Sequence, residues 1–274
     1  MSGPSLGSAG AWSGGEVGAW AVCVLAPNAG PMTLDGTNTW VLHQPGSALA
    51  VVVDPGPADD AHLRHVLDAV ERRGAGVGPV LLTHGHLDHS EGAVAFARLS
   101  GASGVRALDP RHGLGEEGLA DGDVIPVGDA ELRVVGTPGH TSDSLSFLLP
   151  GSAGAAAALL TGDTVLGRGT TVVAHPDGQL GPYLDSLRRL RDLTESVGAT
   201  AIWPGHGPVL DDAHAAVQGY LAHRAERLEQ VRAALAAGDE TPRAVVERVY
   251  ADVDPLLWPA AELSVRAQLE YLTT

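Results

Sequence analysis

The segment T-H-G-H-L-D-H at residues 83–89 constrains this chain more than any other part of its sequence. It contains three imidazoles and one carboxylate, and it follows an apolar run, Val80-Leu81-Leu82, that predicts a buried strand. His84 and His86 are two residues apart, so in an extended segment they share a face and can chelate one metal ion. The next two polar side chains come after the turn begins and are placed for a second ion: Asp88 and His89. The cluster predicts a two-metal site at a strand end.

Length and composition limit what surrounds this cluster. A chain of 274 residues can bury one large core or two modest cores. The sequence contains no run of about 18 uninterrupted apolar residues, so it predicts no membrane-spanning helix. The Gly/Ser-rich start lacks the basic and apolar stretches of a secretory signal, so we expect a flexible leader over residues 1–16. Cys23, the only cysteine, excludes an internal disulfide, fits a reducing cytoplasmic location and is expected to be buried and inert.

The acidic balance of the chain argues against one broad class of partner. The 33 Asp and Glu residues outnumber the 17 basic residues, all of which are arginine, and the formal net charge is −16. A polyanion would be repelled over most of such a surface, whereas nucleic-acid-binding proteins usually carry a basic domain or stripe. Tight, non-specific nucleic-acid binding is therefore excluded, and a local basic patch stays open. The one dense basic cluster could be such a patch, but a solvated helix face explains it equally well: Arg188, Arg189 and Arg191.

Hydrophobic periodicity predicts an α/β fold with two halves, each consisting of strands followed by helices. Short apolar runs bounded by Gly/Pro turns predict strands at residues 17–25, 39–43, 48–54, 80–82, 124–127, 132–136, 145–149, 157–161 and 199–203. Helical spacing predicts helices at residues 59–73, 91–99 and 183–193. His62 and His65 lie on the first of these helices and are expected to be solvated. The two halves indicate two sheets packed between helices.

From residue 211 to the end the pattern is helical. A long amphipathic helix is expected to stop at Gly238, and Thr241-Pro242 predicts an N-cap and first helical position for the next helix. A last helix is expected over residues 258–272. We therefore expect a catalytic domain over residues 17–210 and a C-terminal helical subdomain over residues 211–274.

Four further positions supply the polar side chains that a two-metal site needs. His140, Asp163 and His206 each lie in a Gly-containing loop after a predicted strand. Taken singly, each is more typical of a surface loop or a turn; together with the cluster at residues 83–89, they predict metal binding. Asp54 ends a strand and could hold a ligand imidazole through its other nitrogen. Two threonines adjacent to ligands are candidate supporting donors: Thr141 and Thr164.

The motifs H-G-H-L-D-H, P-G-H-T, G-D-T and P-G-H-G, in this order, resemble those of metallo-β-lactamase-fold hydrolases. The stretches at residues 30–40, 167–172 and 223–227 resemble the beta-lactamase-like protein 2 subgroup, an endoribonuclease family. The resemblance implies a four-layer αββα sandwich with a C-terminal helical extension. It also implies one zinc ion held by His84, His86 and His140, a second held by Asp88, His89 and His206, and Asp163 bridging both. Manganese or iron would also fit these ligands.

Ligand identity separates the chain from some relatives. An oxygen-reducing diiron relative is expected to carry Glu in place of His86, and a zinc β-lactamase of the commonest type Cys in place of Asp163. A mononuclear iron persulfide oxygenase uses fewer of these positions as metal ligands, so the complete set of seven argues against that activity. Two zinc ions about 3.5–4 Å apart can share a water and lower its pKa from ~16 to near neutrality, so a bridging hydroxide would be the nucleophile. Asp88 is expected to orient it as well as to bind metal.

Three classes of function compete. The first is cleavage of single-stranded RNA in a cleft between the core and the helical tail, with bases stacked on Trp40 or Tyr183; a basic groove leading to the metals would support it. The second is hydrolysis of a small acyl thioester or ester, as in glyoxalase II, and a narrow apolar pocket beside the metals would favour it. The third is a non-enzymatic metal-binding scaffold, which the intact ligand set makes improbable. The RNA substrate is placed slightly ahead of the thioester.

Overall fold

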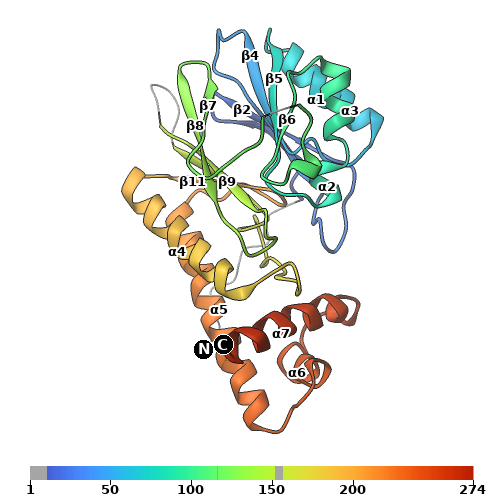
Figure 1. Ribbon diagram of the computed structural model, residues 1–274, viewed down its shortest axis with the longest axis vertical. Coiled ribbons are helices and arrows are strands. Elements are labelled where there is room, and N and C mark those ends of the chain that lie inside the picture. The colour runs from blue at the N-terminus through green and yellow to red at the C-terminus, as the bar shows by residue number, and fades with distance from the viewer. Residues whose placement is uncertain (1–10, 116, 152–156, 274) are drawn as a thin grey trace.

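Two mixed β-sheets pack face to face in the computed structural model, which describes residues 11–115, 117–151 and 157–273 (Figure 1). The first sheet has six strands in chain order: β1 (Gly15–Val17), β2 (Ala21–Leu25), β3 (Asn38–Leu42), β4 (Leu49–Val53), β5 (Gly76–Leu81) and β6 (Val105–Arg106). The second sheet has five strands in the order β11 (Ala201–Pro204), β10 (Ala158–Gly162), β9 (Leu145–Leu149), β8 (Ala130–Gly136) and β7 (Val124–Val127).

Helices cover the outer face of each sheet. The first sheet is covered by α1 (Asp60–Glu71) and α3 (Ala93–Ser100), whose apolar faces form one core with the sheet. The second sheet is covered by α4 (Leu180–Val197) and the first half of α5 (Ala213–Ala236), which form another. Between the sheets lies a third core, in which Trp40 of β3 stacks on Trp203 of β11 with ring centroids 5.2 Å apart. The expected αββα order of layers is confirmed.

The N-terminal strand differs from the expectation. A single strand was expected over residues 17–25, but Gly18, with φ of 60°, begins a turn that folds β1 back onto β2 as an antiparallel pair. Residues 1–10 of the expected leader lie outside the described residues. Residues 15 and 16 belong to β1, and Trp12 Nε1 donates a hydrogen bond to Asn38 Oδ1 at 2.8 Å. This end of the leader is therefore part of the sheet.

The first helix corrects the expectation for one histidine. His62 on α1 is buried, and its Nε2 atom lies 3.0 Å from Thr39 Oγ1. It is adjacent to Leu63 and four residues before Val66, so it lies at the edge of the apolar face that packs on the first sheet. Burial lowers the pKa of His62. The expectation that this histidine is solvated is wrong because the buried face of α1 is wider than its aliphatic residues alone indicate.

The strand connections bring one edge of each sheet together. β4 and β5 run parallel, as do β10 and β11, so the carboxyl ends of each pair lie at the same edge. Backbone hydrogen bonds then join the two edges. Leu145 N donates to Thr83 O at 2.7 Å, and Asn38 N donates to Gly205 O at 2.8 Å. Loops that leave β4, β5, β10 and β11 therefore meet at one rim.

The C-terminal helices form a separate small core. The second half of α5 packs with α6 (Pro242–Val249) and α7 (Trp258–Thr273) around Val231, Val245 and Val265. Thr241 caps α6 by accepting a hydrogen bond from Ala244 N, with Pro242 at the first helical position, as its sequence predicts. Figure 1 shows α5 running from beside α4 down to α6 and α7. Among the described helices, none has the length and apolarity needed to cross a membrane.

Candidate metal centre

The loop after β5 carries the densest part of the site. His84 and His86 lie in an extended segment, and α2 (Leu87–Ser90) begins directly after His86. This short helix turns Asp88 and His89 toward the rim where the two sheets meet. The loop after β8 brings in His140, and the loops after β10 and β11 bring in Asp163 and His206, respectively. All seven side chains predicted as ligands are therefore brought together.

His84, His86 and His140 form the first group, in which one nitrogen of each lies within 4.8 Å of the others. Nδ1 of His86 is 3.0 Å from Nε2 of His84 and 3.1 Å from Nε2 of His140. The outward nitrogens of the latter two face oxygens: Nδ1 of His84 is 3.0 Å from Thr83 Oγ1, and Nδ1 of His140 is 2.8 Å from Val172 O. These oxygens accept the Nδ1 protons, so both Nε2 lone pairs point inward. Converging lone pairs of this kind suit a cation.

Asp88, His89 and His206 form the second group. Nε2 of His206 is 3.2 Å from Asp88 Oδ2 and 3.2 Å from Nε2 of His89. The outward Nδ1 atoms again meet acceptors, Gly36 O at 3.1 Å from His206 and Asp54 Oδ2 at 2.9 Å from His89. The inward nitrogens and the carboxylate are thus fixed in position by contacts on their far sides.

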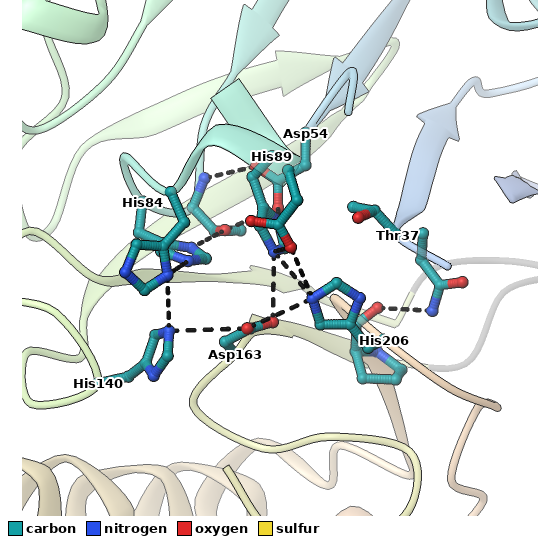
Figure 2. Close-up of polar contacts among 12 residues, drawn as sticks. Thr37, Asp54, His84, His89, His140, Asp163 and His206 are labelled. Carbon is teal, nitrogen blue, oxygen red and sulfur yellow. Dashed lines mark hydrogen bonds and ion pairs between the residues drawn. The ribbon is translucent and has the colours of Figure 1, made fainter. Parts of the chain in front are cut away.

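Asp163 lies between the two groups, as Figure 2 shows. Its Oδ2 atom is 3.6 Å from Nε2 of His140 and 3.4 Å from Nε2 of His206, and its Oδ1 atom is 3.5 Å from Nε2 of His89. Oδ1 is buried and accepts no hydrogen bond from the described residues. A buried carboxylate oxygen without a partner is costly unless a cation neutralises it. The donor set and this oxygen therefore fit metal ions, and the clusters are able to hold them.

The two groups differ in electrostatics. Burial lowers the pKa of His84 and of His140, so both imidazoles are neutral. Burial also opposes protonation of His89 and His206, but the neighbouring carboxylates outweigh it and raise the pKa of His206 to about 9 and that of His89 well above its ordinary value. The same contacts hold the pKa of Asp163 well below its ordinary range despite its burial. The second group therefore holds protons that a metal ion would displace.

Asp54 organises both groups from behind. Besides its contact with His89, it accepts hydrogen bonds from Thr83 N at 2.8 Å and from Thr83 Oγ1 at 2.7 Å. Because Thr83 Oγ1 also faces His84, this carboxylate supports one histidine in each group. The backbone of Asp54 has a φ of 51°, in the left-handed region that costs about 1 kcal/mol for a non-glycine residue. That conformation ends β4 and turns the carboxylate into the rim.

The two threonines predicted as supporting donors make other contacts. Thr141 Oγ1 lies 2.7 Å from Ser144 Oγ, and Thr164 Oγ1 lies 3.4 Å from Thr137 Oγ1. Both side chains hold loop conformations rather than contacting ligand side chains. The supporting hydroxyls are instead Thr83 and Thr171, the latter 3.3 Å from Nδ1 of His140. Thr83 was within the densest motif and could have been found there, whereas Thr171 is 31 residues from its histidine and carried no local signal.

A cavity of about 390 Å³ opens beside the centre, with His140 and Asp163 in its wall. Most of the remaining wall is apolar and comes from three parts of the chain: the loop before β3, the loop after β10 and the segment from α6 to α7. Representative residues from these parts are Met32, Leu34, Leu166, Val172, Val253 and Leu257. The cavity therefore lies between the sandwich and the C-terminal helices.

Two aromatic residues expected to stack on nucleic-acid bases are buried. Trp40 packs on Trp203 and donates from Nε1 to Pro204 O at 3.1 Å. Tyr183 is fully buried and donates from its hydroxyl to Thr164 O at 2.7 Å. The expectation that either side chain stacks on bases is wrong, because both face the interior of the protein. Each arginine of the dense basic cluster pairs with a carboxylate: Arg188 with Asp185, Arg189 with Asp121 and Arg191 with Asp192.

Comparison with protein families places this geometry in a wider group. A profile described as "Metallo-beta-lactamase superfamily" matches residues 32–206, which contain every side chain of the two groups. A second profile, "Beta-lactamase associated winged helix domain", matches residues 241–274, which contain α6 and α7.

Similar proteins carry different names. Atrochrysone carboxyl ACP thioesterase from Aspergillus fumigatus is 36% identical over 78% of this chain. Beta-lactamase-like protein 2 homolog from Caenorhabditis elegans is 32% identical over 84% of this chain and 76% of its own length. The fungal relatives are longer proteins, of whose length this chain spans 60–64%. A solved beta-lactamase domain protein from Burkholderia ambifaria has a TM-score of 0.76 at 24% identity, covering 95% of this chain and 87% of that one, which shows a shared fold.

Proposed function

We propose that this chain, which belongs to the metallo-beta-lactamase superfamily, is a metal-dependent hydrolase of acyl thioesters or esters. The observation that carries the proposal is the apolar cavity whose wall includes His140 and Asp163. A small acyl group would be buried there with its carbonyl beside the metal centre, and burial of its methylenes would contribute about 0.8 kcal/mol each. The name of the Aspergillus fumigatus relative, a thioesterase, supports this choice.

The proposed cofactor is a pair of zinc ions, with manganese or iron as the alternatives. His84, His86 and His140 would hold one ion, Asp88, His89 and His206 the other, and Asp163 would contact both. Bound there, two divalent ions would polarise the scissile carbonyl and lower the pKa of a shared water. The apolar residues of the cavity wall would pack against the acyl group.

Asp88 is the proposed proton carrier. Its side chain is 29% exposed, more than that of Asp163, and burial is outweighed by His89 and His206, which lower its pKa. Its carboxylate can therefore accept a hydrogen bond from the attacking water and orient it toward the acyl carbon. In the reaction the water oxygen bonds to that carbon and the carbon–sulfur bond breaks. The proton that Asp88 takes from the water passes to the leaving thiolate, giving an acid and a thiol.

Cleavage of single-stranded RNA is the second candidate, kept because of the resemblance to the beta-lactamase-like protein 2 subgroup, to which one relative belongs by name. It has less structural support. Three arginines line the cavity beside the centre, but Arg168 pairs with Asp35 and Arg224 is only 5% exposed, so they do not form an exposed basic surface for a nucleic-acid strand. The acidic net charge also opposes a polyanion.

The same proposal assigns a role to each of two parts of the chain. Residues 17–210 would form the catalytic domain, because they carry all of the proposed ligands. Residues 211–274 would form a helical subdomain that closes the cavity. The long helix α5 contributes to the cores of both parts, so the two would move little relative to each other.

Zinc-loaded protein incubated with a panel of acyl thioesters and with a single-stranded RNA tests the proposal. Thioester hydrolysis that is abolished by Asp163→Ala and by His86→Ala is the expected result. RNA cleavage lost in both variants, without thioester hydrolysis, would establish the second candidate instead. RNA cleavage that survives both substitutions would come from a contaminating nuclease and would remove support for the RNA reading.

A further inference from the structure

Two arginines on one face of α5 line the cavity, and neither pairs with a carboxylate among the described residues. Arg224 donates from Nη2 to Thr171 O at 2.6 Å, and its guanidinium lies 4.9 Å from the centroid of the Tyr183 ring. Arg227 donates from Nη1 to Val249 O at 2.6 Å and lies 4.2 Å from the centroid of Tyr250. Both residues are in the cavity wall. Each guanidinium therefore contacts a carbonyl oxygen and an aromatic ring, neither of which carries a negative charge.

Arg224 differs from the other arginines in being buried without a carboxylate partner. Many described arginines pair with a carboxylate, such as Arg232 with Glu229 on the same helix and Arg168 with Asp35, and most of those that do not, such as Arg64 and Arg266, are exposed. Arg224 is only 5% exposed, and its Nε–H group is buried without a hydrogen-bond partner. Burying a charge without a counter-ion is costly, so such a group is expected to meet an anion from outside the chain.

A structural role accounts for only part of this arrangement. Thr171, which receives the Nη2 hydrogen bond, contacts His140 through its hydroxyl, so Arg224 also helps to hold that loop. One hydrogen bond would serve that purpose. It leaves the rest of the guanidinium, and the second arginine three residues later, unexplained.

His223 adds a neutral polar group to the same wall. Its Nδ1 atom is buried and has no hydrogen-bond partner in the described part of the chain. Burial, together with the neighbouring Arg224 and Arg227, lowers its pKa to about 4, so the ring is uncharged at neutral pH. An otherwise apolar cavity therefore has a cationic and polar strip along α5.

We infer that the α5 strip, defined as His223, Arg224 and Arg227, binds a carboxylate carried by the substrate, so that the preferred substrates are thioesters of short dicarboxylic acids. A planar guanidinium suits a carboxylate because it can donate two parallel hydrogen bonds. The link from Arg224 through Thr171 to His140 places this charge close to the proposed reaction centre, which favours a short acyl chain. The phosphates of an RNA strand are disfavoured as the anion, because Arg224 is reached only from within a cavity of about 390 Å³, where a small carboxylate fits better than a polymer.

The inference rests on the proposed thioesterase function, and two substrate pairs separate the two ideas. Succinyl and glutaryl thioesters are compared with butyryl and valeryl thioesters on one thiol carrier, and each is then compared on an uncharged thiol carrier. The wild-type kcat/KM is expected to be at least about tenfold higher for the dicarboxylic substrates on both carriers, a difference of about 1.4 kcal/mol. A preference that follows the carrier rather than the acyl group would assign the anion to the thiol half and overturn the inference.

Arg227→Gln and Arg227→Lys are the informative variants, because Arg227 donates to Val249 O and not to the Thr171 loop that supports His140. Arg232→Gln, on the exposed face of α5, is the matched control. Arg227→Gln is expected to lower the ratio of kcat/KM for succinyl over butyryl thioester, and Arg227→Lys should recover part of it, since charge returns without the planar geometry. Arg232→Gln should behave as wild type. An unchanged ratio in Arg227→Gln would overturn the inference.

Binding to wild-type protein provides a test that needs no variant to fold. Calorimetric titration of the zinc-loaded protein with glutarate and with butyrate is expected to show tighter binding of glutarate by at least about tenfold. Equal binding of the two acids would overturn the inference even if butyryl thioester is hydrolysed. Absence of hydrolysis of every thioester would instead contradict the proposed function itself.

Discussion

Oδ2 of Asp54 lies 2.9 Å from Nδ1 of His89, and the same carboxylate accepts a hydrogen bond from the hydroxyl of Thr83, whose oxygen faces Nδ1 of His84. One side chain behind the rim therefore orients a histidine in each of the two groups (Figure 2). It reaches them from β4, a strand that carries none of the proposed ligands.

Asp54→Asn is expected to weaken metal binding. An amide can present an NH₂ group to His89 Nδ1–H, and it supports the ring less strongly than a carboxylate does. Loss of such an outer contact typically lowers metal affinity by about 10–100-fold. Competition with a chromogenic chelator measures the change, and Asp60→Asn, an exposed substitution on α1, is the control. Wild-type affinity in Asp54→Asn would show that the carboxylate does not support the ligands.

Gly205→Ala is expected to abolish metal binding while leaving the fold largely intact. A Cβ atom at Gly205 would lie 2.5 Å from Asp163 Oδ1 and 2.8 Å from His89 Cε1, so both proposed ligands would have to move. The matched control is Gly219→Ala on α5, where a Cβ meets nothing within 4 Å. That control should raise stability by up to about 1 kcal/mol, since alanine favours a helix over glycine. Zinc content by elemental analysis and thermal unfolding distinguish the two; zinc retained in Gly205→Ala would contradict the proposed coordination.

Zinc affinity is expected to rise as the pH rises toward 9. The pKa of His206 is raised to about 9 in the metal-free protein, and a metal ion binds only the neutral imidazole. Because the folded-state pKa exceeds the ordinary value, the carboxylate contacts stabilise metal-free protein fully below about pH 6.5, and this stabilisation is lost as the pH rises through about 9. Calorimetry at pH 7 in buffers of different ionisation enthalpy should detect proton release on zinc binding. Proton-neutral binding would show that the second group is already deprotonated.

Ala260→Leu is expected to shorten the acyl group that the cavity accepts. Ala260 lies in the cavity wall on α7, and the larger side chain would occupy space that longer acyl chains need. Loss of room for one or two methylenes corresponds to about a 10–200-fold lower kcat/KM for long substrates, with short ones little affected. Ala251→Leu, at an exposed position outside the cavity wall, is the control. Equal losses for short and long substrates would place the acyl group elsewhere.

Cys23 is expected to be unreactive in the native protein. It is buried in β2 with its thiol 3.2 Å from Asn38 Oδ1, and burial raises its pKa far above the ordinary value. A thiol-specific chromogenic reagent at pH 8 should therefore label the protein only after denaturation. Rapid labelling without denaturant would show that β2 opens readily.

The sequence alone determined the identities of the side chains at the rim and the class of fold. Thr83–His89 placed three imidazoles and a carboxylate at a strand end, and the motifs around His140, Asp163 and His206 followed in the expected order. Local signals of this kind survive folding because strand periodicity and Gly-containing loops depend on near neighbours. For the same reason the edges of most strands and the cap of α6 could be predicted.

Only the tertiary structure decided which groups support these side chains and what lies beside them. His62, expected in solvent, is buried because the first sheet covers that edge of α1. Thr171 and Arg224 become part of the site because α5 packs against the loop after β10, a contact between residues 53 apart in the sequence. The packing of elements that are far apart in the sequence determines these contacts, so a pattern of neighbouring residues cannot predict them. The cavity on which the proposed acyl substrate depends arises in the same way, between the sandwich and the C-terminal helices.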